Sequence, residues 1–252
     1  MSKLSGKTAL VTSGAFGLGR EFALRLALLG ADVAVLDTVV PPEMLETIRA
    51  LGVKACKVEG DIGNPEFVID AISNIEQQLG EISVCVCDSD GFGGDFESQT
   101  ALTSDMIGFD ALFDKNVKGM MNVVRAVAPT MKKNRYGKIV TVSSHTGIES
   151  LENGANAQYG AAMAAVRSFT ASAAAELGPH GITVNCIAPG WIELPTVQLD
   201  RDRRDYCIAT TSLGRMGTPA DCAGVLEFLV TELSGFVTGT TIEVTGGTTK
   251  KQ

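Results

Sequence analysis

A glycine-rich turn near the N-terminus has the residue types and spacing needed to bind a phosphate group. The turn, residues 12–19, contains Gly14, Gly17 and Gly19, follows a short apolar run and leads into a helical pattern. Glycines let a backbone approach a pyrophosphate closely, and the start of the next helix supplies free N–H groups and the positive end of its dipole. We therefore expect cofactor contacts from Ser13, Gly14, Phe16, Gly17, Leu18 and Gly19.

Asp37 is the second residue that points to a dinucleotide, because it ends the next apolar run about 20 residues after the turn. A carboxylate at this place can accept hydrogen bonds from both ribose hydroxyls and would repel a 2′-phosphate. No Arg or Lys occurs at residues 13–18 or at Thr38 to compensate for that repulsion. The pattern predicts NAD rather than NADP. The alternative interpretation is a tight structural turn followed by a solvated Asp.

Further motifs occur in the order found in short-chain dehydrogenases/reductases, and the chain resembles that family over nearly its whole length. The glycine turn resembles the family's T-G-x-x-x-G-x-G motif, and residues 245–247 resemble its C-terminal D-G-G. Asp61 and Ile62 match the pair beside the adenine, and Pro189 and Gly190 match the segment that lines the nicotinamide. The resemblance implies cofactor contacts at Asp61, Ile62, Met163, Pro189, Gly190 and Ile192.

The same resemblance implies three catalytic residues, which are Tyr159, Ser144 and Asn116. Tyr159 opens the sequence Tyr-Gly-Ala-Ala, Ser144 follows the apolar run 139–143, and Asn116 stands where the family has its helix-four asparagine. Tyr159 would be the acid/base, Ser144 would hold the substrate oxygen, and Asn116 would order a helix kink or a water. The alternatives are a turn or N-cap residue for Ser144 and a surface helix position for Asn116.

Four departures from the family pattern bear on these roles. Ser13 occupies the position of the first glycine, and the N-N-A-G motif reads Cys-Asp-Ser-Asp at residues 87–90. Leu194 stands where a threonine binds the carboxamide of the nicotinamide, with Thr196 two residues further on. Met163 replaces the lysine of Y-x-x-x-K, which lies one helical turn after the tyrosine on the same face.

The loss of this lysine affects proton transfer. Oxidation of an alcohol by hydride transfer needs a base for the hydroxyl proton. A free phenol has a pKa near 10, and a neighbouring ammonium lowers it by favouring the charged form. Methionine offers neither this charge nor hydrogen bonds to the ribose hydroxyls.

Three explanations for Met163 remain open. The protein is a working dehydrogenase in which the positive nicotinamide and another cation or water replace the lysine, with His145 and Arg167 as candidates. Alternatively, the chemistry has changed to a reaction without hydride transfer, as in halohydrin dehalogenases, although the arginine and the altered glycine turn of those proteins do not occur here. In the third case the protein binds dinucleotide and catalyses little.

Alternating strand and helix patterns along the chain must position these residues. Strands are expected at residues 8–12, 32–37, 54–59, 82–87, 137–142, 182–187 and 241–244, and helices at 17–30, 43–51, 65–79, 117–131, 159–177 and 219–229. This alternation predicts a single doubly wound Rossmann-type α/β domain over residues 1–252, with a mainly parallel seven-stranded sheet and helices on both faces. The expected irregular segments 88–103, 144–158 and 191–217 emerge at the carboxyl ends of the strands, where ligands bind in such sheets.

Composition excludes several other classes of protein. The net charge of −8 argues against nucleic-acid binding, and no apolar run approaches the roughly 18 residues of a membrane helix. The six cysteines are scattered and the two histidines are far apart, which predicts no metal site and a cytoplasmic location. The expected function is NAD-dependent interconversion of a secondary alcohol and a ketone, in a homo-oligomer (tetramer or dimer) as the resemblance implies.

Overall fold

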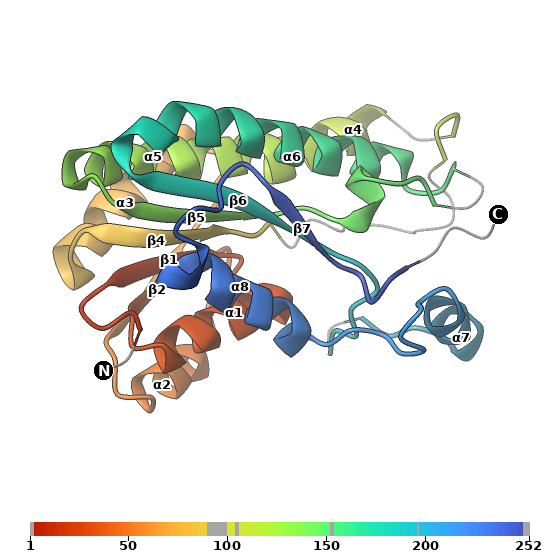
Figure 1. Ribbon diagram of the computed structural model, residues 1–252, viewed down its shortest axis with the longest axis horizontal. Helices are drawn as coiled ribbons and strands as arrows, with labels where there is room; N and C mark the ends of the chain where they lie inside the picture. The colour runs from red at the N-terminus through yellow and green to blue at the C-terminus, as the bar shows by residue number, and fades with distance from the viewer. Residues whose placement is uncertain (1–2, 90–99, 104–105, 152–153, 196, 249–252) are drawn as a thin grey trace.

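Seven parallel strands form the centre of the computed structural model, which describes residues 3–89, 100–103, 106–151, 154–195 and 197–248 (Figure 1). The sheet order is β3-β2-β1-β4-β5-β6-β7, and every neighbouring pair is parallel. The strands are β1 (Thr8–Thr12), β2 (Asp32–Asp37), β3 (Ala55–Glu59), β4 (Ile82–Cys87), β5 (Gly137–Val142), β6 (Ile182–Pro189) and β7 (Thr241–Val244). The predicted doubly wound sheet is confirmed.

Helices cover both faces of this sheet (Figure 1). On one face lie α1 (Gly17–Leu28), α2 (Pro42–Arg49) and α8 (Pro219–Val230), and on the other lie α3 (Pro65–Leu79), α5 (Gly119–Asn134) and α6 (Ala157–Leu177). Each face has its own apolar core. Because both faces are covered, central strands such as β1 and β5 are buried along their whole length, which agrees with the apolar residues 9–11 and 139–140 at their centres.

The chain order reverses between β1 and β4, and this reversal positions the site. After β3 the chain crosses to β4 on the other side of β1, so the connections that follow β1 and β4 leave the sheet in opposite directions. A crevice opens at such a switch point, outside the carboxyl ends of the strands. The glycine turn follows β1 there, and Asp88 follows β4.

Two helices lie outside the expected ones. The helix α4 (Met106–Phe113) precedes a π-helical turn at Asp114–Lys118, and α7 (Arg201–Ala209) occupies part of the segment expected to be irregular. That expectation was wrong for α7, whose polar sequence buries only Cys207 and so lacks an apolar helical period. Its one sequence signal is Asp200, whose side chain caps the helix by accepting a hydrogen bond from the Arg203 N–H at 2.8 Å.

The helices of the described chain differ from membrane-spanning helices in length or composition. None of them is long and apolar enough to cross a membrane.

Candidate active site

The glycine turn between β1 and α1 depends on two residues in the left-handed backbone region. Ser13 has φ +48° and Gly17 has φ +53°. A Cβ atom added to Gly19 would overlap the Ser13 carbonyl oxygen, so only glycine fits where the helix passes back over the turn. Ser13 therefore adopts the conformation that glycine takes most easily, and the tight turn is formed despite the substitution.

A cavity of about 600 Å³, here called the Asp37 cavity, lies on one side of this turn. The Asp37 carboxylate is held at its edge, because it accepts hydrogen bonds from the backbone N–H groups of Ala15 (3.1 Å) and Thr38 (2.7 Å). Five of the predicted cofactor residues line this cavity, namely Ser13, Phe16, Asp37, Asp61 and Ile62.

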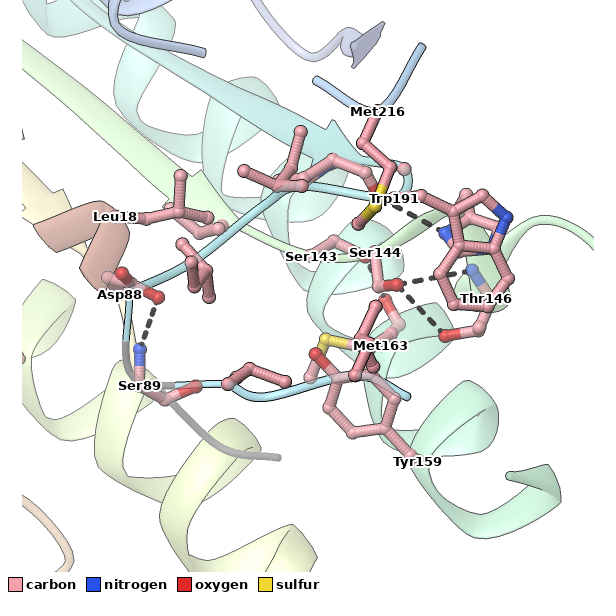
Figure 2. A pocket seen from close by; sticks show the side chains of 18 of the residues that line it. Leu18, Asp88, Ser89, Ser143, Ser144, Thr146, Tyr159, Met163, Trp191 and Met216 are labelled. Carbon is pink, nitrogen blue, oxygen red and sulfur yellow. Dashed lines mark hydrogen bonds between the residues drawn. The ribbon is translucent and has the colours of Figure 1, made fainter. Parts of the chain in front are cut away.

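A second cavity of about 480 Å³, here called the Tyr159 cavity, lies on the other side of the turn (Figure 2). The predicted residues that line it are Leu18, Ser144, Tyr159, Met163, Pro189, Gly190 and Ile192. Its walls are mainly apolar, with Val142, Trp191, Leu194, Val197, Leu199 and Met216 in addition. Its volume is in the range of small-molecule sites, which run from about 300 to 1,000 Å³. Residues of the glycine turn and of helix α1 thus line both cavities, with Ser13 and Phe16 in one and Leu18 in the other.

Ser144 faces the Tyr159 cavity with its hydrogen-bonding capacity partly used. Its Oγ accepts hydrogen bonds from the Thr146 backbone N–H (3.3 Å) and from the Thr146 hydroxyl (3.0 Å). A serine hydroxyl accepts two hydrogen bonds and donates one. Both acceptor positions of Ser144 are therefore occupied, and its proton is left to donate to a ligand oxygen.

Tyr159 and Met163 lie one turn apart on α6 and both face this cavity (Figure 2). Close backbone packing holds α6 against the short 3-10 helix His145–Gly147 that follows β5 and Ser144. The Ser143 hydroxyl donates to the Met163 carbonyl oxygen at 2.9 Å. A Cβ at Gly147 would lie 2.7 Å from the Met163 carbonyl carbon, closer than real side chains approach a backbone.

Replacement of Gly147 by alanine is therefore expected to push α6 away from Ser144. We expect Gly147→Ala to lower the free energy of unfolding by about 1–3 kcal/mol, because the new methyl group overlaps backbone atoms. Chemical denaturation measures this loss. Gly178→Ala is the matched control, since nothing lies within 4 Å of a Cβ at Gly178. Equal stability of the two variants would contradict the close packing.

His145 and Arg167 were considered as replacements for the missing lysine. Neither of them places a positive charge beside Tyr159. Burial lowers the pKa of His145 below its ordinary value of 6.5, so this side chain is neutral at pH 7. Its Nδ1 lies 3.3 Å from the Pro189 carbonyl oxygen. The Arg167 guanidinium donates to the Gly147 carbonyl oxygen at 2.9 Å, and Arg167 is absent from the described lining of the Tyr159 cavity.

Asn116 lies in the π-helical turn and is 1% exposed, so the alternative of a surface position is wrong. Its Oδ1 accepts a hydrogen bond from the Ser89 hydroxyl at 2.6 Å, and its Nδ2 donates to the Leu112 carbonyl oxygen at 2.9 Å. Asn116 thus ties the irregular helix to the end of β4. It is not among the described residues that line either cavity.

Some residues of the site were missed or lie outside the described chain. Asp88, Ser89 and Arg203 line the Tyr159 cavity and were not predicted to do so. A signal that could have found Asp88 was its position directly after a strand. Arg203 belongs to the segment 191–217 that was expected to be irregular, and it is half-buried over the rings of Trp191 and Tyr206. Leu194 lines the cavity, whereas Thr196, Asp90 and Gly91 fall outside the described residues.

Comparison with known proteins decides the family. The sequence profile described as Enoyl-(Acyl carrier protein) reductase matches residues 14–249. A short-chain type dehydrogenase/reductase from Mycobacterium marinum superposes with a TM-score of 0.90 at 31% identity, over 98% of this chain and 97% of that one. The chain belongs to the short-chain dehydrogenase/reductase family. The prediction of an oxidoreductase is thereby confirmed at the level of the class of enzyme.

Two further relatives of this short-chain dehydrogenase/reductase act on named compounds. A cyclohexanol dehydrogenase of Rhodococcus sp. (strain TK6) is 39% identical, over 98% of this chain and 97% of the relative. The crystal structure of carveol dehydrogenase from Mycobacterium avium in complex with NAD has a TM-score of 0.91 at 25% identity, over 98% of this chain and 99% of that one. Both similarities extend over the whole fold rather than over the glycine turn alone.

Proposed function

We propose that this protein is an NAD-dependent oxidoreductase that interconverts a secondary alcohol and a ketone. The observation that carries the proposal is the Tyr159 cavity, where Tyr159 and Ser144 face a mainly apolar space beside Leu18 and the Pro189–Gly190 segment. Tyr159 acts as the acid/base, and Ser144 donates a hydrogen bond to the substrate oxygen. Asn116 holds the helix end in place.

The residues of the glycine turn and the two cavities fit an extended dinucleotide. Only glycine is accommodated at position 19, which leaves the backbone of the turn bare where a pyrophosphate would lie. Asp37 would bind the adenosine ribose, with Asp61 and Ile62 beside the adenine, while Leu18 and the 189–192 segment would contact the nicotinamide. When bound, NAD accepts the hydride of the alcohol carbon or, in its reduced form, returns it to the ketone.

Proton transfer is the part of the reaction that this chain performs itself. In alcohol oxidation the hydroxyl proton passes to the Tyr159 oxygen while the C–H electron pair leaves as hydride, and in ketone reduction Tyr159 gives the proton back. The proton of Ser144 is directed to the same oxygen, because its lone pairs already accept from Thr146. Met163 contributes packing and no charge.

The lining of the Tyr159 cavity favours a compact apolar substrate. Eleven of its described lining residues have aliphatic, proline, methionine, tyrosine or tryptophan side chains, and Asp88 and Arg203 are the only Asp, Glu, Lys or Arg residues among those described. This agrees with the names of two relatives, a cyclohexanol dehydrogenase and a carveol dehydrogenase. We propose a cyclic secondary alcohol or its ketone as the substrate class, acted on by a single-domain, cytoplasmic homo-oligomer (tetramer or dimer).

A second candidate function is favoured by Met163. A family member without the lysine can bind dinucleotide and catalyse little, or carry out a changed reaction without hydride transfer. The dehydrogenase and the inactive dinucleotide binder share cofactor binding and differ in turnover, whereas a reaction without hydride transfer does not require the cofactor.

Cofactor binding is measured by energy transfer from Trp191, the single tryptophan, which lines the Tyr159 cavity. We expect NADH to quench Trp191 emission and NADPH to bind more weakly, because Asp37 repels a 2′-phosphate. A Trp191→Phe variant is the control for signal that arises from NADH alone. Absence of binding at millimolar NADH would exclude the dehydrogenase and the inactive dinucleotide binder. Binding together with turnover across a panel of cyclic alcohols would select the dehydrogenase.

A further inference from the structure

Thr146 lies in the wall of the Tyr159 cavity, two residues after Ser144 and within the 3-10 helix His145–Gly147. Its hydroxyl donates to the Ser144 Oγ at 3.0 Å, and its backbone N–H donates to the same atom at 3.3 Å. Figure 2 shows both hydrogen bonds meeting at Ser144. Every residue except proline has the N–H, whereas the other bond needs a hydroxyl on the side chain. The residue type at position 146 therefore decides whether Ser144 accepts one hydrogen bond or two.

Close packing against the first turn of α6 holds Thr146 in place. A Cβ atom added to Gly160, the residue after Tyr159, would lie 2.7 Å from the Thr146 carbonyl oxygen. One residue further along the 3-10 helix, Gly147 makes the similar approach to Met163 described above. The position of Thr146 relative to the start of α6 is thus set by contacts between backbones, which leave no room for a side chain.

The two hydrogen bonds limit the directions in which the Ser144 hydroxyl can donate. A serine hydroxyl rotates freely about its Cβ–Oγ bond unless its neighbours fix it, and it accepts two hydrogen bonds and donates one. Ser144 is buried, so its proton depends on a protein or ligand group for a partner. With both lone pairs engaged by Thr146, the proton is confined to the remaining direction around the oxygen.

The hydrogen bond from Thr146 also makes Ser144 a stronger donor, because the members of a chain of hydrogen bonds polarise one another. In ketone reduction the substrate oxygen gains negative charge as the hydride arrives. A donor that points at this oxygen stabilises the transition state more than the ground state. A group that improves the donor is therefore expected to affect the rate of reaction more than the binding of substrate.

A structural role for Ser144 and Thr146 can be separated from this effect. A serine at the start of a helix caps it by accepting a backbone N–H, and Ser144 caps the 3-10 helix by accepting the N–H of Thr146. A valine at position 146 keeps this N–H and the branched shape of threonine. It lacks only the hydroxyl, so the cap remains while the second hydrogen bond is lost.

We propose that Thr146 is a positioning residue, whose hydroxyl directs the Ser144 proton to the substrate oxygen and strengthens its donation in the transition state. The inference rests on the proposed function, because it assigns Thr146 a part in a reaction of Ser144 and Tyr159. Thr146 acts through Ser144 and exchanges no proton with the substrate. It is not among the catalytic residues that the family resemblance implies.

The test compares Thr146→Val with Thr146→Ser in the reduction of a cyclic ketone by NADH. We expect Thr146→Val to lower kcat about tenfold, the contribution of one hydrogen bond, and to leave KM and the dissociation constant of NADH within about twofold. Thr146→Ser keeps the hydroxyl and is expected to retain kcat within about threefold. Thr183→Val is the matched control, because Thr183 lies on β6 outside the described lining of both cavities. Its buried hydroxyl has no hydrogen-bond partner in the described part of the chain, so full activity is expected.

A double variant shows whether Thr146 acts through Ser144. In the Ser144→Ala background no hydroxyl remains to be directed, so adding Thr146→Val is expected to lower kcat by less than about twofold further. Thermal unfolding shows whether each variant is folded. Should Thr146→Val not fold, the comparison of Thr146→Ala with Thr146→Ser decides in its place, because these two variants differ only in the hydroxyl.

The outcomes separate this inference from the proposed function. The inference is overturned if Thr146→Val keeps the kcat of the unmodified protein, if it raises KM alone, or if Thr146→Ser loses as much activity. It is also overturned if the full effect of Thr146→Val persists in the Ser144→Ala background. In each of these cases the unmodified protein still turns over the ketone. If it does not, the proposed function itself fails and the role of Thr146 fails with it.

Discussion

Tyr159→Phe is expected to lower kcat for alcohol oxidation by about a thousandfold, the usual contribution of a positioned acid or base. Phenylalanine keeps the ring, which packs against the core beneath α6, and lacks only the oxygen that exchanges the proton. NADH affinity and the melting temperature are therefore expected to stay close to those of the unmodified protein. Steady-state kinetics with a cyclic alcohol, together with NADH titration, measure both quantities.

The chain offers a matched control for this variant. It contains three tyrosines, and Tyr136 is outside the described lining of both cavities. The Lys7 Nζ atom lies over the Tyr136 ring, 3.9 Å from the ring centroid. Tyr136→Phe is expected to keep full activity. If Tyr159→Phe kept more than about a tenth of the activity, proton transfer would not pass through Tyr159.

Met163→Lys is expected to raise alcohol oxidation at pH 7 by about 10- to 100-fold. An ammonium one helical turn from Tyr159 favours the phenolate, and a shift of about two pH units in its ionisation corresponds to roughly 2.7 kcal/mol. The apolar stem of lysine replaces a methionine that is 1% exposed, while the ammonium reaches into the Tyr159 cavity. Rates from pH 6 to 10, with a deuterated alcohol to show that hydride transfer limits turnover, measure the change.

The absence of a lysine at position 163 also affects how the rate of alcohol oxidation by the unmodified protein depends on pH. Because an unperturbed phenol has a pKa near 10 and position 163 supplies no ammonium to favour the phenolate, the oxidation rate is expected to rise steeply between pH 7 and 9. The lysine variant would reach its plateau at lower pH. Met163→Leu keeps an apolar side chain of similar volume and is expected to follow the unmodified profile. A flat profile in the unmodified protein, or loss of activity in a folded Met163→Lys, would contradict this account.

Much of the fold was predictable from sequence because its signals are local. The central strand β4 is a short run that is apolar except for Ser83, and α3 keeps its expected bounds of Pro65–Leu79 because Asn64 caps it and Gly80 ends it. The helix α7 was missed for the opposite reason. Its side chains are mostly polar, and the helix is recognised only once Asp200 is seen to cap it.

The sequence by itself determined the glycine turn, the Asp37 carboxylate and the absence of a lysine at position 163, since each depends on residue type and spacing along the chain. Tertiary structure alone decided what surrounds Tyr159. The neutrality of His145 follows from its burial, the hydrogen bond of Arg167 from the approach of Gly147 to α6, and the place of Asp88 in the cavity wall from the meeting of β1 and β4. Burial and orientation depend on elements far apart in the sequence, so the charge of this cavity emerges only when they pack together.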